Sequence, residues 1–256
     1  MKKFRLNSAI LLAVAAILLV MSTVGSTQAA LTYYSDNFSA EVTVSNIGVT
    51  LLENGKEISR RIYIGESTDK LWDETTGSLL SNMIDTENGE KLVLGQSYDE
   101  MLTVKNSGAI DSYVRVVLTK SWQSDVDTTD KVKYEKNTLL SPEHIELHLK
   151  ENSGWVIDSK ASTKERIVLY HTEILKVGAE TDACIDTVRI SPKILNDIKV
   201  TTPETGKVNY EYEYDGHIFV LEAEVDAVQP HNAKDAIKSA WGVDVTVAAD
   251  GSISLN

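Results

Sequence analysis

Two runs of alternating side chains in the middle of the chain constrain its fold more than any other feature. In the first run, Leu102 and Val104 share one face. In the second run, one face carries Val114, Val116 and Leu118, and the other carries Tyr113, Arg115, Val117 and Thr119. A period of two with β-branched residues is typical of half-buried strands. The polar residues 106–108, Asn-Ser-Gly, supply turn chemistry between the runs, so residues 102–122 predict the spine of a β-sandwich.

The same alternation recurs along the chain and is interrupted by turn signals. Asn54-Gly55 favours a tight hairpin, because both residue types accept the positive φ angles of such a turn. One helix is predicted over the sequence HNAKDAIKSAWG, with Asn232 as its N-cap and Gly242 at its end. Its apolar face would lie on the sandwich and consists of Ala236, Ile237, Ala240 and Trp241. The pattern predicts an all-β fold, an antiparallel β-sandwich of jelly-roll type with one short helix in the C-terminal region.

Residues 66–90 lack a clean period of two. Their apolar residues, among them Leu71, Trp72 and Leu79, would line short helices or an irregular loop. A segment of this length without regular structure is unusual inside a compact domain. We therefore expect an irregular insertion at 66–90, over one end of a single sandwich domain that spans residues 31–256.

The first 30 residues have the order of a secretory signal peptide. A basic start with Lys2, Lys3 and Arg5 precedes an apolar run at residues 9–21 and the small-residue stretch STVGSTQAA. The apolar run is shorter than the about 20 residues that span a bilayer. Small residues favour cleavage after Ala29 or after Ala30, and the alternative is an uncleaved N-terminal anchor. The prediction is a secreted protein that meets the membrane only through its uncleaved signal peptide.

The charge balance is acidic, with 25 Lys and Arg residues against 38 Asp and Glu residues. Removal of the leader, which holds three basic residues and no acidic one, takes the formal net charge from −13 to −16. Such a surface repels phosphate backbones, which argues against nucleic acid as a partner. The single cysteine, Cys184, excludes an internal disulfide, and its setting predicts a small buried side chain rather than a nucleophile.

The sequence shows no pattern of a catalytic, cofactor or metal site. Asp125, Asp127 and Asp130 lack the spacing of a calcium-binding loop, so a solvated loop is expected there. The stretch HIELH, from His144 to His148, does not have the order of the zinc peptidase motif. Along a strand, four residues separate two histidines by about 13 Å, which is too far for one zinc ion. We predict no catalytic residue, no cofactor and no metal.

A tyrosine-rich segment lies near the C-terminus. Tyr210, Tyr212 and Tyr214 alternate with glutamates, and an Asp-Gly pair separates them from a second alternating run at residues 219–225. The pattern predicts a hairpin with an aromatic stripe. Cross-strand packing is the commoner cause of such a stripe, and the alternative is a contact surface for a carbohydrate or a protein.

Several of these motifs together resemble those of a known family. The central sequence VKNSGAIDSYVRV, at residues 104–116, is similar to the central motif of Gram-positive secreted proteins related to TasA and camelysin. Tyr33-Tyr34-Ser35-Asp36 is similar to the Tyr-Phe-Ser-Asp that follows their cleavage site. The resemblance continues through residues 155–181 and the helix segment, although Val177 stands where the family often has proline. Proteins of this family leave the cell through a dedicated signal peptidase of the SipW type.

The resemblance implies a structural role in the extracellular matrix or at the cell surface. The mature chain would self-associate into fibres of a biofilm matrix, after processing by a signal peptidase of the SipW type. A physical route is strand donation by the segment that cleavage frees, which begins with Leu31, Thr32, Tyr33, Tyr34, Ser35 and Asp36. Two alternatives are a camelysin-like zinc peptidase and a monomeric surface-binding module or adhesin that uses the tyrosine stripe.

Overall fold

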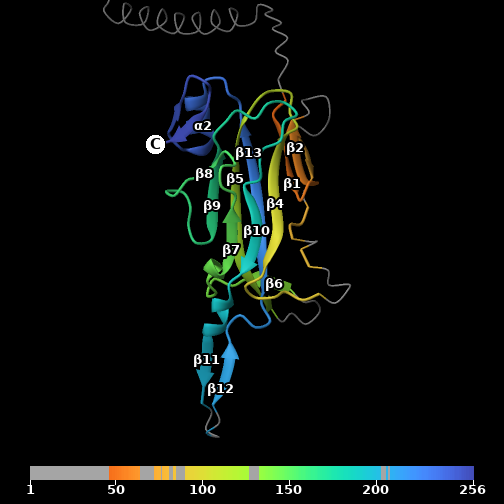
Figure 1. The fold of residues 1–256 in the computed structure, drawn as a ribbon, viewed down its shortest axis with the longest axis vertical. Helices are drawn as coiled ribbons and strands as arrows, with labels where there is room; N and C mark the ends of the chain where they lie inside the picture. Colours follow the sequence, from red (N-terminus) through yellow and green to blue (C-terminus); the bar gives the residue numbers. More distant parts are fainter. Residues whose placement is uncertain are drawn as a thin grey trace, which may run out of the picture. The chain divides into compact units, whose positions relative to one another are not determined.

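Antiparallel strands dominate the computed structural model, which describes residues 46–63, 72–75, 77–80, 83–84, 90–126, 133–202, 206 and 208–256. All of them belong to one compact unit, Ser45–Asn256. The predicted all-β class is confirmed, and the strands form two large sheets (Figure 1).

The first large sheet has six strands in the order β3-β2-β1-β4-β10-β7. Its strands are β1 (Gly48–Glu53), β2 (Lys56–Tyr63), β3 (Trp72–Thr75), β4 (Ser97–Asn106), β7 (Ile145–Leu149) and β10 (Ile185–Ile190). The predicted Asn54-Gly55 turn joins β1 to β2, and both of its residues have positive φ angles.

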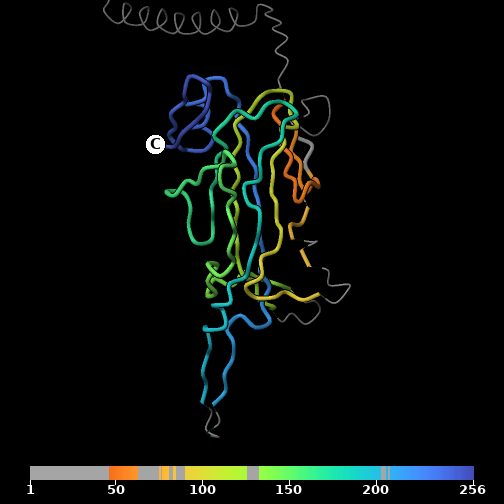
Figure 2. Tube along the Cα trace, in the orientation of Figure 1, coloured from red at the N-terminus to blue at the C-terminus, as the bar shows by residue number. Residues whose placement is uncertain are grey.

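The second large sheet has five strands, with the order β13-β5-β9-β8 and with β6 paired to the far end of β5. Its strands are β5 (Tyr113–Val126), β6 (Lys133–Lys136), β8 (Trp155–Ile157), β9 (Arg166–His171) and β13 (Ile218–Val228). The chain passes between the two sheets repeatedly, after β4, β6, β7 and β9 and again before β13 (Figure 2). The pairings of β1 with β4, β4 with β10, β10 with β7, β5 with β9 and β5 with β13 therefore join strands that are not consecutive in the chain.

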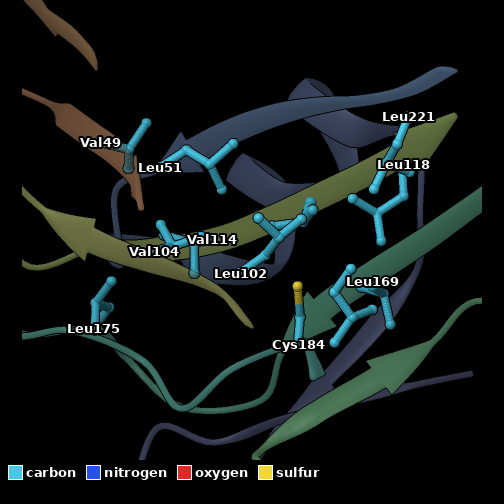
Figure 3. Packing of buried hydrophobic residues seen from close by; sticks show 12 residues of the cluster. Val49, Leu51, Leu102, Val104, Val114, Leu118, Leu169, Leu175, Cys184 and Leu221 are labelled. Atoms are coloured by element: carbon cyan, nitrogen blue, oxygen red, sulfur yellow. The ribbon is translucent and has the colours of Figure 1, made fainter. Parts of the chain in front are cut away.

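The two large sheets enclose the main core, which contains both faces predicted from the central spine. Leu102 and Val104 of β4 meet Val114, Val116 and Leu118 of β5, and none of the five is exposed to solvent. Figure 3 labels Leu102, Val104, Val114 and Leu118 of this cluster together with neighbours from β1, β9 and β13. The sandwich thus follows from the period of two, because each strand turns alternate side chains to one shared interior.

The outer face of β5 is also buried, which the half-buried pattern did not predict. Tyr113 and Val117 lie under the C-terminal region, where Tyr113 donates a hydrogen bond to the Gly251 carbonyl over 2.6 Å. That region consists of α2 (Ala233–Trp241) and the hairpin of β14 (Val245–Val247) and β15 (Ile253–Leu255). The five-stranded sheet is therefore covered on both faces along part of β5.

The predicted helix is confirmed as α2, with two differences of detail. Ile237 is fully buried, and Gly242 ends the helix in a left-handed conformation, as expected. Asn232, however, is itself left-handed and makes no side-chain cap; its amide instead donates to the Asp235 carboxylate over 2.9 Å. Ala240 is exposed, so the buried face is narrower than the sequence pattern indicated.

The predicted hairpin of residues 210–214 with residues 219–225 is wrong. The strand β12 (Asn209–Tyr212) pairs with β11 (Ile198–Thr201), whereas β13 pairs with β5 along its whole length. The Asp-Gly turn is present, but the strands on its two sides belong to different sheets because β5 offers β13 eleven residues of backbone pairing. Two short 3₁₀ helices, η1 (Pro142–His144) and η2 (Pro192–Asn196), precede β7 and β11.

The described residues of the expected insertion at 66–90 contain one regular element. Residues 72–75 form β3 at the edge of the six-stranded sheet, paired with β2, where the sequence predicted short helices or a loop. Leu79, Leu80 and Met83 are partly buried against the core clusters. Residues 66–71, 76, 81–82 and 85–89 of the segment lie outside the described residues.

Candidate strand-acceptor groove

The strand β13 has one edge that no described strand pairs with. Its other edge follows β5 from Ile218 opposite Gln123 to Val228 opposite Tyr113. An edge strand presents unpaired backbone N–H and C=O groups, which are a template for another strand. Eleven residues make β13 long for such an edge.

Two cavities lie along this edge and together form a groove between β13 and the β1–β2 hairpin. The larger, about 370 Å³, is lined by residues 220–223 of β13 and by Leu51, Ile58 and the segment 77–79. The smaller, about 80 Å³, is lined by residues 225–227 of β13 and by Val49, Arg61 and residues 47–48. We call this groove, with these lining residues, the acceptor groove.

The floor of the acceptor groove is the main core itself. Val49 and Leu51 of β1 and Leu221 of β13 belong to the core cluster and are buried. A strand laid along β13 would therefore gain backbone pairing and would cover apolar side chains of both sheets. The exposed residues Glu222 and Glu224 stand on the same strand, and charges of this kind limit unspecific pairing at an edge.

The wall opposite β13 is packed closely against β2. A Cβ atom at Gly77 would lie 2.6 Å from the Ile58 carbonyl oxygen, so only glycine fits there without a shift of the backbone. The Leu80 amide, three residues on, donates to Glu53 Oε1 over 2.5 Å. These contacts fix the described part of this segment at one end of the groove.

Glu53 is half of a buried carboxyl pair. Glu100 of β4, the other half, is 1% exposed. Burial, a hydrogen bond to Glu53 and the negative charge of Glu53 together raise the pKa of Glu100 to about 8. Glu100 is therefore protonated at neutral pH, and its carboxyl group donates to Glu53. Its Oε1 atom has no hydrogen-bond partner among the described residues.

The predicted cleavage residues Ala29 and Ala30 and the predicted donor residues 31–36 lie outside the described residues. The described chain begins at Asn46, and Ile47 and Gly48 line the smaller cavity. The described chain therefore begins next to the acceptor groove.

The structure separates the three tyrosines of the predicted stripe. Tyr210 is 69% exposed and Tyr212 is 48% exposed, on the two-stranded sheet of β11 and β12. Tyr214 is 8% exposed and packs edge-on against Trp122, with ring centroids 5.0 Å apart. Its hydroxyl accepts a hydrogen bond from the Ser141 amide over 2.9 Å. Tyr214 is thus a core residue, and only Tyr210 and Tyr212 can form a contact surface.

The histidines of the HIELH stretch have different partners. His144 Nε2 lies 3.1 Å from an oxygen of Asp197, and His148 Nδ1 lies 2.7 Å from an oxygen of Asp186. Among the described residues, no group of three or more His, Cys, Asp or Glu side chains could hold a metal ion.

Cys184 is 1% exposed, and burial raises the pKa of its thiol to about 12, so its predicted place in the core is confirmed.

The acceptor groove was not found from the sequence. The alternating residues 219–225 predict a strand, but no local signal tells which of its edges remains unpaired. Within the part of the chain that the structure describes, no helix is long and apolar enough to cross a membrane. No family model, curated protein or solved structure matches the chain.

Proposed function

We propose that the mature chain is an extracellular structural subunit that polymerises when residues 31–39 of one copy enter the acceptor groove of the next. The observation that carries this proposal is the unpaired edge of β13 beside a groove with an apolar floor. Strand addition of this kind obtains affinity from backbone hydrogen bonds and specificity from alternate side chains.

The dimensions of donor and acceptor agree. Nine residues in extended conformation span about 30 Å, which is within the length of the eleven-residue strand β13. Leu31 and Tyr33 fall on one face of the donor segment and would cover the apolar floor, while Thr32 and Tyr34 fall on the other. The groove and the donor are different surfaces of one chain, so the contact is head-to-tail and produces an open filament rather than a closed dimer.

The resemblance of the central motif and of the sequence after the cleavage site to TasA and camelysin supports the same proposal. Proteins of that family are secreted through a signal peptidase of the SipW type, and TasA forms matrix fibres. Secretion, this processing enzyme and a place in the extracellular matrix or at the cell surface are parts of the proposal. Cleavage after Ala29 or Ala30 would free the donor segment only outside the cell.

A second candidate function is that of a monomeric surface-binding module. Tyr210 and Tyr212 favour it, because both are exposed on a two-stranded sheet that carries Ile198 and Val200 opposite them. Such a module would bind a glycan or a protein and would not polymerise.

Light scattering after size-exclusion chromatography tests the two functions. We expect large assemblies from a chain that begins at Leu31 and monomers from a chain that begins at Ala40, because only the first has the donor. A chain from Leu31 with Tyr33→Asp is the matched control for length, and we expect it to polymerise poorly. Monomers from every chain would overturn the fibre proposal and favour the binding module.

A further inference from the structure

A cavity of about 580 Å³ lies on the outer face of the five-stranded sheet, separate from the acceptor groove. The turn between β8 and β9 forms one side of it, and the end of α2 with the C-terminal hairpin forms the other. Its volume is within the range of small-ligand sites, which combine apolar walls with a few placed polar groups. Here the apolar walls include Ile157, Val243 and Leu255.

One wall of the cavity is a fixed aromatic and cationic cluster. The rings of Tyr170 and Trp241 are 5.4 Å apart, and the Arg115 guanidinium lies 5.5 Å from the centre of the Trp241 ring. Asp226 holds that guanidinium, with its Oδ2 atom 3.0 Å from Arg115 Nε. The Arg115–Asp226 ion pair and the tilted contact of the two rings fix the orientation of Trp241 before any ligand binds.

The opposite wall is a turn held by its own hydrogen bonds. Asp158 Oδ1 accepts from the backbone amides of Lys160 and Ala161 over 2.9 and 3.1 Å. The Val168 amide donates to the Ser162 hydroxyl over 3.0 Å. The turn is therefore preorganised, and binding would cost little conformational entropy.

Positive charge remains available in this cavity, although the chain as a whole is acidic. Arg166 lines the cavity and forms no ion pair with any carboxylate of the described residues. The two acidic side chains of the lining are already engaged, Asp158 by the turn and Asp244 by Lys238. Lys160 also lines the cavity, and its ammonium group donates to the Asn256 carbonyl.

We propose that this cavity binds a sugar acid, with the carboxylate on the Arg166 guanidinium and the pyranose ring beside Trp241. A guanidinium matches a carboxylate through two parallel hydrogen bonds, and an aromatic side chain offers an apolar surface to a sugar ring. The proposal does not depend on fibre formation, because no residue of the donor segment takes part.

Isothermal titration calorimetry of the chain that begins at Ala40 tests the site, with D-glucuronate, D-glucose and acetate as probes. We expect saturable binding of glucuronate at least about tenfold tighter than that of glucose or acetate, because only glucuronate offers both ring and charge. Arg166→Gln should weaken glucuronate binding about tenfold or more, the effect of one charge-assisted contact. Arg189→Gln, on β10 of the other sheet, removes the same charge and should leave the affinity unchanged.

Three results would overturn the assignment. They are an absence of saturable heat with glucuronate at tens of millimolar, equal affinities for glucuronate and either of the other probes, and an unchanged affinity in Arg166→Gln. Arg166 is exposed, so its replacement should not unfold the chain, and thermal unfolding of each variant verifies this.

Discussion

At the scale of single residues, the chain buries groups that sequence reasoning places on the surface by default. Glu53 and Glu100 lie inside the sandwich. The hydrogen bond between the protonated Glu100 and Glu53 takes the place of the water that would solvate these groups at the surface. The alternation of apolar and polar residues predicted which face of a strand points inward. It did not predict that an acidic residue would occupy that face. A buried carboxyl is stable only with a hydrogen-bonding partner, which here lies on a neighbouring strand. The residues around each glutamate in the sequence do not show which strand will be its neighbour.

The buried carboxyl pair makes stability depend on pH in a defined direction. The pKa of Glu100 in the folded chain, about 8, is above its ordinary value of 4.5, so the folded chain holds an extra proton between these values. This contribution to stability is complete below pH 4.5 and is lost as pH rises through about 8. We expect Glu100→Gln, which stays neutral, to gain about 4 kcal/mol in free energy of unfolding relative to the parent between pH 5 and pH 9.

Urea unfolding at several pH values measures this difference. Glu211→Gln, at an exposed position on β12, is the matched control and should follow the parent at every pH. Parallel stability profiles for the parent and Glu100→Gln would contradict the shared proton.

Cys184 gives a second prediction at the residue scale. Its thiol is buried among Leu102 and Leu169 (Figure 3), and its pKa is raised to about 12 by burial. Because the thiolate is the reactive form, we expect the folded chain to react with an aromatic disulfide reagent at pH 8 at least about a hundredfold more slowly than the urea-unfolded chain. Similar rates in the two states would show that the thiol is accessible.

At the scale of elements, the period of two predicted most strands and their inward faces. The helix, the Asn54-Gly55 hairpin and the central spine follow from local residues, and the structure confirms them. The pairing of β12 was predicted wrongly, because an Asp-Gly turn after an alternating run favours a hairpin but does not decide which strand the next run joins. Likewise β3 was missed, since four residues are too few to show a period.

The separation of the tyrosines gives a prediction for these elements. Tyr214→Ala should destabilise the chain by about 3 kcal/mol, because it removes a buried ring from beside Trp122 and leaves the Ser141 amide without its acceptor. Tyr210→Ala, at an exposed position on β12, should change the free energy of unfolding by no more than about 0.5 kcal/mol. Denaturant titration of both variants measures this, and equal effects would contradict the assignment of Tyr214 to the core.

At the scale of the whole molecule, the acceptor groove arises from strand order and not from any motif. Residues of β1, β2 and β13 line it, and these strands are separated by more than 150 residues of chain between Tyr63 and Ile218. The donor could be predicted because the predicted signal cleavage would define its start. Its acceptor was not, because an unpaired edge exists only once all the pairings of the sheet are known.

The most direct test of the account is disulfide trapping between donor and groove. Chains from Leu31 with Asp36→Cys are mixed with chains from Leu31 carrying Glu222→Cys, and copper-catalysed oxidation is followed on non-reducing gels. We predict a disulfide-linked dimer of the two variants, because residue 36 is near the middle of the donor on the face with Thr32 and Tyr34, away from the floor, and the exposed Glu222 lines the groove on that side of β13. Glu211→Cys, at an exposed site on β12, is the control and should give little dimer. Equal dimer from both partners, or none from Glu222→Cys, would contradict insertion of the donor beside β13.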